Sequence, residues 1–460
     1  MRGTSGGVLM AATSEDQMIL EIIKHLKERN LKDFNSLLEE LQPYDQARLY
    51  LNLPEKHRTR FLTLANAEQL ADLIQELEQG RQLEILNKLG LEKASRIMDL
   101  MDNDDLATLL GGLSREETET FLSVMKKEES RIVMDILEHP PETAGRLMTN
   151  RYVWIPVHYT VGETVNKLKS FAEIAETINY LYVIDSDKKL VGVVSYRDLL
   201  LAGTGEKISD IMFTRVISVP VDTDQEDVAR IIERYDFLAV PVVEENNVLV
   251  GIVTVDDVLD VIIKEADEDI GKLSATGNTI DFDTRAWTAA RRRLPWLVLL
   301  LLLGLISGSI ISVFDDTLQQ VVALAFFMPM IAGMTGNTGT QSLAVVVRGL
   351  VSRDINKNTA LRLVMRELGV GIIIGATCGV LIAVIAYLWL GNPVLGLVVG
   401  SSLLITLIIG TLAGTVIPLL VYKMKIDPAV ASGPLITTLN DVFSLTVYFG
   451  VATFFIAYLV

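Results

Sequence analysis

The C-terminal third of the chain contains long stretches without a charged side chain, and these constrain the fold more than any other feature. Three such stretches are bounded by Arg293 and Asp315, by Asp316 and Arg348, and by Glu367 and Lys423. Gly391-Asn392-Pro393 divides the last one, and a further apolar stretch runs from about Pro434 to Val460. Because about 20 apolar residues cross a bilayer, we predict five transmembrane helices within residues 291–460.

The charges between these stretches predict the orientation. Asp315-Asp316 follow the first span, whereas basic residues gather before it and in the second and fourth connections: Arg291, Arg292, Arg293, Arg348, Arg353, Lys357, Arg362, Arg366, Lys423 and Lys425. Positive loops stay in the cytoplasm. We therefore expect the N-terminal part inside the cell, Val460 outside, and a location in the cell (inner) membrane. Residues 1–17 lack the apolar core of a secretory signal and are expected to be a disordered leader.

Asp441 is the single ionisable side chain within any of these apolar spans. A carboxylate at bilayer depth costs at least ~2.5 kcal/mol, so it normally faces a bundle interior or an aqueous path. Asn440, Thr437 and Thr438 surround it with polar groups on a helix that is otherwise apolar. An acid near a helix end that reaches the headgroups is the alternative, but aspartate is short for that role.

The second predicted span is also polar, with Pro329 and the stretch Gly336-Asn-Thr-Gly-Thr-Gln341 in mid-membrane. Polar groups at that depth are tolerated where they are buried in protein or line a wet cavity. We therefore predict that Asn337 and Gln341, with Thr437 and Thr438, support a path containing Asp441. Glycines four residues apart predict close helix packing elsewhere: Gly304 and Gly308; Gly371, Gly375 and Gly379; Gly410 and Gly414.

Charge divides the chain into two parts. Residues 291–460 hold 10 basic and 6 acidic side chains, whereas the first 290 hold 31 and 52, a formal charge of −21. This disfavours nucleic acid and anionic lipid as partners and favours cations, with plain solubilising charge as an equal alternative. Cys378 and four scattered histidines form no zinc or copper ligand set, so a bound metal should be hard and oxygen-liganded. The sequence shows neither a nucleophile paired with a base nor a phosphate-binding loop, so an enzyme is not expected.

The acidic part contains a helical region and an internal repeat. Residues 18–139 show short amphipathic helices of similar length, which predict a stacked helical solenoid. His139-Pro140-Pro141 ends it. The stretch from Leu147 then recurs from Ile211, each copy followed by a helix, a strand, Leu-Val-Gly and a strand-to-helix step. This pattern resembles tandem CBS domains, within residues 140–263 and spanning about 147–202 and 211–263.

Two Ser/Thr-x-x-Asp segments close the repeats, Ser195 to Asp198 and Thr254 to Asp257. In CBS domains such residues can hold the ribose of an adenosine ligand, but the same spacing also caps a helix. The next segment, residues 264–290, is expected to connect the repeats to the membrane. It begins within an acidic helix in which Asp257 and Asp260 share one face, as do Glu265, Glu268 and Asp269. A solvated helix surface is the alternative interpretation.

Together, these features resemble the MgtE family of bacterial magnesium channels. The resemblance implies a multidomain membrane protein with an all-α N domain, α/β tandem CBS domains, a connecting (plug) helix and five transmembrane helices. It implies a homodimer that conducts Mg2+ and closes when cytosolic Mg2+ is plentiful. By position, Asp441 matches the pore carboxylate, and eight acids match regulatory magnesium ligands: Asp72, Asp104, Glu226, Asp236, Asp257, Asp260, Glu268 and Asp269. Three residues fall near the site at which some members hold ATP: Tyr180, Arg197 and Phe237.

The chain departs from the family pattern at four positions. Thr108 replaces an expected acid, Thr335 and Ser444 replace glycines, and Gly433 replaces a polar residue. Chemistry agrees with the implied function, since two Asp441 side chains facing each other across a dimer axis would balance a hydrated divalent ion. A carrier that couples divalent cations to H+ or Na+ and a membrane-anchored nucleotide sensor without transport remain alternatives.

Overall fold

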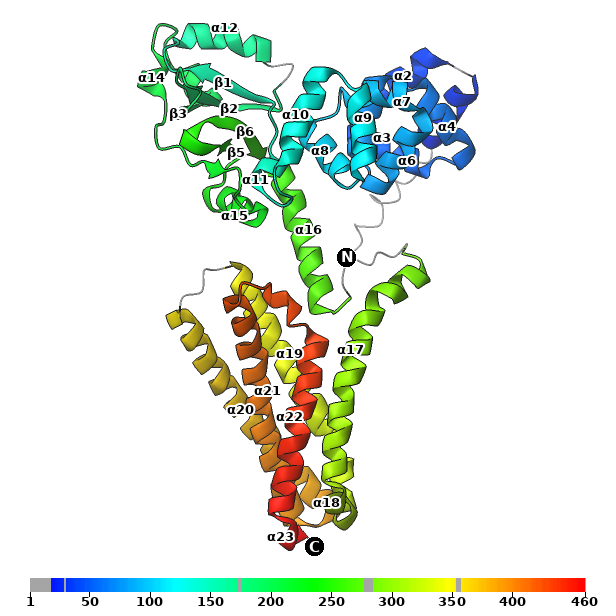
Figure 1. The fold of residues 1–460 in the computed structure, drawn as a ribbon, viewed down its shortest axis with the longest axis vertical. Helices are drawn as coiled ribbons and strands as arrows, with labels where there is room; N and C mark the ends of the chain where they lie inside the picture. The colour runs from blue at the N-terminus through cyan, green and yellow to red at the C-terminus, as the bar shows by residue number, and fades with distance from the viewer. Residues whose placement is uncertain (1–17, 29, 172–174, 277–283, 353–356, 460) are drawn as a thin grey trace, which may run out of the picture. The chain divides into compact units, whose positions relative to one another are not determined.

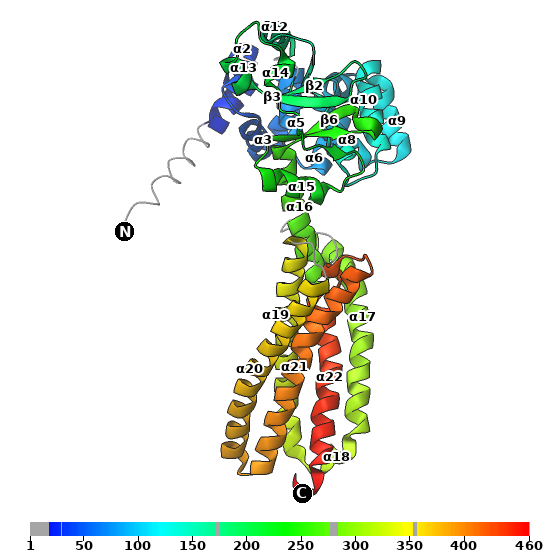
Figure 2. The same ribbon diagram turned by 90° about the vertical axis from the view of Figure 1, so that its left-hand side faces the viewer.

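The computed structural model describes residues 18–28, 30–171, 175–276, 284–352 and 357–459, so the predicted leader at 1–17 lies outside the described residues. The chain divides into two compact units, Met1–Ile262 and Ile263–Val460. Figures 1 and 2 show helices alone in the second unit and both helices and strands in the first. The two units are described separately below.

The N domain of the first unit is a stack of short helices. After helical residues 18–28 come α2 (Leu31–Glu39), α3 (Pro43–Asn52), α4 (Glu55–Leu64), α5 (Ala67–Gln75), α6 (Gln79–Leu89), α7 (Leu91–Met98), α8 (Asn103–Gly111), α9 (Arg115–Val124) and α10 (Lys127–Glu138). Asn66 and Ser114 begin α5 and α9 with reciprocal capping boxes. One continuous hydrophobic core runs from Ile22 to Ile136, as expected when each short helix buries its apolar face against its neighbours.

The predicted repeat folds into two small sheets of the same topology. The first repeat comprises α11 (Ala144–Leu147), β1 (Tyr152–Pro156), α12 (Val161–Phe171), β2 (Thr177–Ile184), β3 (Leu190–Ser195) and α13 (Tyr196–Leu201). The second comprises α14 (Ile208–Ile211), β4 (Val219–Pro220), α15 (Gln225–Tyr235), β5 (Ala239–Val243), η1 (Glu245–Asn247), β6 (Leu249–Thr254) and the start of α16 (Val255–Leu273). In each sheet the first two strands are parallel and the last two antiparallel.

The two repeats share a hydrophobic core. Tyr182 and Ile184 of β2 pack with Ala239, Leu249 and Ile252 of the second sheet. The predicted boundary between repeat and connecting segment, at 263/264, lies inside α16, which runs without interruption from Val255 to Leu273. The last turns of the second repeat and the acidic connecting segment are therefore one helix.

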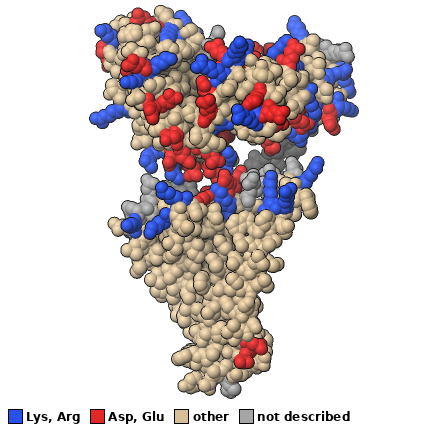
Figure 3. Space-filling view, in the orientation of Figure 1, with Lys and Arg blue, Asp and Glu red and all other residues tan. Residues whose placement is uncertain are grey.

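The second unit is a bundle of long helices. It contains α17 (Ala286–Val313), α18 (Asp315–Gln320), η2 (Val322–Phe326), α19 (Met328–Ser352), α20 (Lys357–Leu390), α21 (Pro393–Lys423), η3 (Pro428–Val430), α22 (Gly433–Phe454) and α23 (Ile456–Leu459). Figure 3 shows that charged side chains are sparse on its visible face between the two ends. In the described part of the chain, four helices are long and apolar enough to cross a membrane: α17, α20, α21 and α22.

The predicted second span is α19, a continuous helix of 25 residues. Its mid-helix glycines, threonines and amides make it too polar to be recognised by hydropathy, although it packs against α21 and α22 inside the bundle. The fifth transmembrane helix therefore stays a prediction. Proline and glycine produce no break in this helix, so its polar character comes from side chains.

Glycine packing is confirmed at two of the three predicted sets. A Cβ atom on Gly400 of α21 would lie 2.5 Å from the carbonyl oxygen of Gly379 on α20, and one on Gly410 would lie 2.8 Å from that of Thr335 on α19. These backbones approach so closely that only glycine fits. Gly304 and Gly308 behave differently, because nothing lies within 4 Å of their Cβ positions in the single chain. For that pair the packing prediction is wrong within one chain.

Candidate functional site

Three carboxylates converge in the first unit from segments far apart in the sequence. Asp104 lies in the first turn of α8, Glu176 directly precedes β2, and Asp257 lies in the first turn of α16. One oxygen from each lies within 4.8 Å of the other two. In the part of the chain that the structure describes, no other group of three His, Cys, Asp or Glu side chains meets this criterion. The N domain and both repeats therefore contribute to one point, called here the carboxylate trio.

Among the described residues, no basic side chain forms an ion pair with a carboxylate of the trio. Asp104 is 6% exposed, and its Oδ1 is buried without a hydrogen-bond partner among the described residues. Thr254 Oγ1 donates to Asp257 Oδ2 at 2.5 Å. Burial and then repulsion from Asp257 hold the pKa of Asp104 well above its usual range, and burial, with Glu176 adding, raises the pKa of Asp257 to about 7. Bound protons or a bound cation would offset the negative charge of these three carboxylates.

A second acidic group lies beside the trio and is partly bridged by an amide. Gln75 Nε2 donates to Asp102 Oδ2 at 2.8 Å and to Asp105 Oδ2 at 2.9 Å. Asp102 also pairs with Arg151. Burial raises the pKa of Asp105 to about 6, with Asp102 and Asp260 adding to the rise. Asp105 is thus part of the acidic region although the sequence analysis did not select it.

The predicted ligands Asp72 and Asp260 lie on the rim of this region. Burial raises the pKa of Glu76, and the charges of Asp260 and then Asp72 raise it further. Burial followed by the charge of Asp102 raises the pKa of Asp72 itself. These two aspartates are electrostatically coupled to the acidic group around Gln75, but neither belongs to the trio.

Glu226 and Asp236, both predicted as ligands, lie outside the trio. Glu226 is in the first turn of α15, where Arg230 Nη2 lies 3.0 Å from its Oε2. Asp236 ends the same helix in the left-handed conformation, with φ 53° and an exposed side chain. One chain therefore does not gather them with Asp104 and Asp257, and their role as magnesium ligands stays a prediction.

The residues predicted to hold ATP lie at different elements of the repeats. Tyr180 is in β2 opposite Ser195, Arg197 is exposed in α13, and Phe237 stacks on Tyr235 with ring centroids 5.4 Å apart. Both Ser/Thr-x-x-Asp segments form local hydrogen bonds: Ser195 Oγ donates to Asp198 Oδ2 at 2.6 Å, as Thr254 does to Asp257. Ser195 Oγ also accepts a hydrogen bond from the Asp198 N–H, so the capping alternative is confirmed for the first segment. ATP binding stays a prediction.

Asp441, the predicted pore carboxylate, lies on α22 and is half-buried. The neighbouring Thr437 and Thr438 each donate a hydroxyl to the backbone carbonyl one turn earlier, Gly433 O and Pro434 O, at 2.9 Å. Among the described residues, no hydrogen bond to the Asp441 carboxylate is observed. One chain therefore supplies a single, incompletely surrounded carboxylate at this position.

Asn440 differs from Asp441 although it is adjacent. Its side chain is fully buried against α19, and its Nδ2 donates to Thr335 O at 3.4 Å. Thr335 and Ser444 replace family glycines, and their hydroxyls hydrogen-bond to backbone carbonyls of their own helices, Ile331 O and Asp441 O. Asn440 thus joins α22 to α19, whereas Asp441 lies on a less buried face.

Asn337 and Gln341 are exposed on the surface of the single chain. They lie four residues apart and therefore share one face of α19. Thr338 and Ser342, one position further along, are buried at 5% and 4% exposure. The structure thus places the two predicted pore-supporting amides on the face of α19 that the rest of the chain leaves uncovered.

Glu367 was treated in the sequence analysis as the border of a span, yet it is the most buried carboxylate of the second unit among the described residues. It lies on α20 at 5% exposure and accepts a hydrogen bond from Ser342 Oγ at 3.0 Å. The adjacent Arg366 lies 2.8 Å from its other oxygen. The helix bundle therefore contains a second acid, Glu367, in addition to Asp441, and Glu367 is the more buried of the two.

The predicted ligands Glu268 and Asp269 lie in the second unit, on the C-terminal half of α16. Lys272 Nζ lies 2.6 Å from Glu268 Oε1. Burial, followed by the charge of Asp427, raises the pKa of Asp269. These two acids therefore belong to an environment formed with the turn between α21 and α22.

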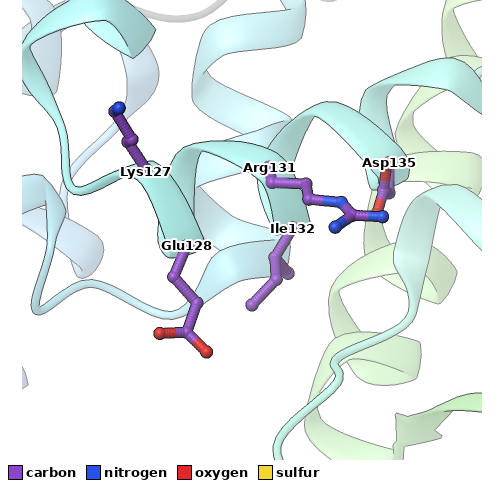
Figure 4. A pocket seen from close by; sticks show the side chains of 5 residues that line it. All are labelled: Lys127, Glu128, Arg131, Ile132 and Asp135. Atoms are coloured by element: carbon purple, nitrogen blue, oxygen red, sulfur yellow. The ribbon is translucent and has the colours of Figure 1, made fainter.

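In the described part of the chain, the cavity along α10 is lined by none of the predicted site residues. This cavity has a volume of about 600 Å³, and Lys127, Glu128, Arg131, Ile132 and Asp135 line it (Figure 4). Its mixed charges do not resemble an oxygen-only cation site. The carboxylate trio is a contact between elements, and a metal ion would fit there without a cavity large enough for an organic ligand.

Family models match most of the chain. Residues 41–142 match the MgtE intracellular N domain, residues 144–205 and 208–264 match the CBS domain, and residues 328–451 match the MgtE divalent cation transporter model. The chain is 61% identical over 441 residues to the magnesium transporter MgtE of Bacillus subtilis (strain 168), covering 96% of this chain and 98% of the relative.

This chain belongs to the MgtE family. The family member from Thermus thermophilus is 42% identical over 317 residues, 68% of this chain and 69% of the relative. Among solved structures, the soluble part of a magnesium transporter matches with a TM-score of 0.53 and 37% identity, covering 55% of this chain and 99% of that one. The cytosolic domain of the Mg2+ channel MgtE in complex with ATP matches with a TM-score of 0.50 and 35% identity, covering 53% and 99%.

Family membership and the apolar helices confirm a membrane protein with a helical N domain and tandem CBS domains. Sequence reasoning missed Glu176, which directly precedes β2, and Asp105, one residue beyond the selected Asp104. The available signal for Asp105 was the acid-rich start of α8, where three of the four residues 102–105 are aspartates.

Proposed function

We propose that this MgtE family member is a magnesium channel of the bacterial cell membrane, which closes when cytosolic Mg2+ binds between its acidic cytoplasmic segments. The carboxylate trio carries the proposal. Mg2+ prefers hard oxygen ligands, and the buried Oδ1 of Asp104 lacks a hydrogen-bond partner in the described residues. An ion held by Asp104, Glu176 and Asp257 would join the N domain, the first repeat and α16. The similarity to the magnesium transporters of Bacillus subtilis and Thermus thermophilus supports magnesium as the transported ion.

Closure follows from charge. Without a cation the trio and the group around Gln75 repel one another, which favours separation of α8 from α16. A divalent ion binds better where the carboxylates converge than where they are apart, so it shifts the population toward the converged arrangement. An almost complete shift takes about 5.5 kcal/mol, which several coupled sites at ~1–3 kcal/mol each supply. The remaining predicted regulatory ligands, Asp72, Asp260, Glu226, Asp236, Glu268 and Asp269, would add to this coupling.

The proposed ion path is formed by a homodimer. Asn337 and Gln341 are exposed on one chain, and amides facing hydrocarbon are unfavourable. A second copy packed on this face of α19 would place them beside a wet path. Two Asp441 carboxylates would then balance one hydrated Mg2+. In this arrangement the basic connections face the cytoplasm, together with the N-terminus, and the C-terminus lies outside.

ATP is proposed as a second cytoplasmic ligand, because a solved MgtE cytosolic domain similar to this chain is a complex with ATP. Arg197 is exposed and can meet a phosphate, and Tyr180 and Phe237 offer rings to a base. Arg197→Ala should weaken ATP binding to the purified full-length protein, measured by titration calorimetry. Arg234→Ala, an exposed arginine of α15, is the control. Equal affinities for both variants would contradict this assignment.

Patch recordings test the channel proposal. With Asp104→Asn and Asp257→Asn combined, currents should persist at cytosolic Mg2+ concentrations that silence the wild type, because the variant retains the path but loses ligands of the closed state. Inhibition like that of the wild type would contradict closure through the trio. Mg2+ uptake without any single-channel current would instead favour the coupled carrier, and binding of ATP without uptake would favour the sensor.

A further inference from the structure

The end of α16 is attached to the transmembrane helices of the second unit through one lysine. Lys272 Nζ lies 2.6 Å from Asp427 Oδ2 and 2.6 Å from Glu268 Oε1. Asp427 belongs to the turn between α21 and α22, and its other oxygen, Oδ1, accepts a hydrogen bond from the Ala429 N–H at 2.8 Å. The carboxylate is therefore held in place by its own turn when the ammonium group binds it.

An apolar contact accompanies this ion pair. Leu273, the residue after Lys272, packs in a cluster with Ala429, Ala431 and Ile436 of the turn and of α22, and with Leu343 of α19. A Cβ atom on Gly433 would lie 3.5 Å from the Leu273 carbonyl oxygen. That distance is an ordinary van der Waals contact, so Gly433, one of the departures from the family pattern, lies directly beside the end of α16. This end therefore rests on the start of α22, two turns before Asp441.

Lys272 is surrounded by acids. Glu268, Asp269 and Asp427 surround it, and the exposed fractions of the Lys272, Glu268 and Asp427 side chains are 29%, 40% and 36%. Burial opposes the ammonium charge, but hydrogen bonds to Asp427 and Glu268 outweigh it and hold the pKa of Lys272 above its usual range. Without this cation, three like charges would meet at the contact and would push α16 away from the turn.

We propose that Lys272 is a built-in cation that latches the end of α16 to the turn preceding α22, and so restrains the pore helix before any Mg2+ is bound. The proposal rests on the proposed function in one respect, namely that attachment of α16 favours the closed path. The lysine is then a positioning residue that sets the basal closed population, and Mg2+ bound elsewhere adds to it. Loss of the latch raises the Mg2+ concentration needed for closure.

The test compares Lys272→Gln with Lys264→Gln in the full-length protein, by patch recording at graded cytosolic Mg2+. Lys264 lies on the same helix, two turns earlier, and is exposed. Lys272→Gln should raise the half-inhibiting Mg2+ concentration about fivefold or more, the lower end of ordinary coupling. Lys264→Gln and the charge-conserving Lys272→Arg should stay within about twofold of the wild type. The Arg variant also shows that the position tolerates substitution.

A double-mutant cycle identifies the partner. Asp427→Asn keeps an amide oxygen for the Ala429 N–H but removes the charge, so it should shift inhibition as Lys272→Gln does. The double variant should shift it no further, because both single changes break one interaction. Fully additive shifts, or wild-type inhibition in Lys272→Gln, would overturn the latch. Absence of Mg2+ current in the wild type would contradict the proposed channel instead, so the two failures are distinguishable.

Discussion

The two acidic sites of this MgtE family member differ in how much of the site one chain supplies. In the first unit, three carboxylates from α8, the edge of β2 and α16 lie within 4.8 Å of one another. In the second unit, Asp441 is a single half-buried carboxylate, and the neighbouring amides Asn337 and Gln341 are exposed. One chain brings the three carboxylates of the trio together, whereas at Asp441 it supplies a single carboxylate, which the proposed function completes with a second copy.

Under the proposed function, this difference matches the demands of regulation at the trio and of conduction at Asp441. A regulatory site must bind its ion more tightly in one arrangement than in another, which requires ligands on segments that can separate. A conducting site must let the ion leave, so it favours few charges and a retained hydration shell. Variants that remove charge are therefore expected to have different effects at the two sites. Loss of the Asp441 charge should lower transport, and loss of charge at the trio should lower the inhibition by cytosolic Mg2+.

The largest effect is expected for Asp441→Ala. Mg2+ uptake into proteoliposomes should fall to background, at least about 100-fold, because the proposed path loses its one carboxylate per chain and with it the negative charge that balances a hydrated divalent ion. Asp441→Asn should lose most of the uptake as well. Asp316→Ala, at an exposed acid of α18, is the matched control and should transport normally. Near-normal uptake by the alanine variant would remove Asp441 from the path.

The sequence predicted the elements that depend on composition and periodicity, namely the apolar helices and the repeated sheets. Charge-free stretches of bilayer length became α17, α20, α21 and α22, and the repeated segment became two sheets of equal topology. These features arise from local pattern and length, which do not require knowledge of three-dimensional contacts.

The remaining site residues depend on contacts that a sequence does not display. Glu176 lies just before β2, and it becomes a candidate ligand because Asp104 of α8 and Asp257 of α16 come close to it. Glu367 adjoins Arg366 and a basic segment, so it looked like a border residue, yet the approach of α20 to α19 buries it against Ser342. For α19, hydropathy did not indicate a spanning helix because glycines, threonines and the amides Asn337 and Gln341 interrupt its apolar residues.

Glu176→Gln is the sharper test of the trio, because sequence alone did not indicate this residue. The half-inhibiting Mg2+ concentration in patch recordings should rise about fivefold or more, since one ligand of the converged state is lost and coupling energies of ~1–3 kcal/mol are usual. Glu92→Gln, an exposed acid of α7 paired with Arg96, should leave inhibition unchanged. Equal inhibition in the two variants would mean that the trio is a solvated acidic surface.

Asn337→Leu and Gln341→Leu distinguish a lipid-facing from a path-facing side of α19. If these amides face the path, leucine should lower Mg2+ uptake several-fold and leave the protein folded, because the wet wall becomes apolar. If they face lipid, leucine should be neutral or stabilising. Thr377→Leu, at an exposed hydroxyl of α20, is the control and should transport normally. Unchanged uptake in all three variants would contradict the proposed dimer face.

The smallest effect is a dependence of stability on pH in the absence of Mg2+. The folded-state pKa of Asp105 is raised to about 6 and that of Asp257 to about 7, and the pKa of Asp104 is raised as well. Between the ordinary carboxylate range and these values the folded state binds more protons than the unfolded state. Stability should therefore fall as the pH rises from about 4 through 7.

Thermal unfolding of the full-length protein in detergent with a chelator should show this trend for the cytoplasmic transition. The melting temperature should be about 3 °C or more lower at pH 8 than at pH 5, and Mg2+ should restore it, because the ion replaces the lost protons as the compensating charge. The Asp104→Asn and Asp257→Asn double variant should show a flatter profile with a weaker response to Mg2+. A melting temperature that rises between pH 5 and pH 8 in the chelated wild type would contradict the uncompensated trio, and with it the contrast between a site that one chain completes and a site that it does not.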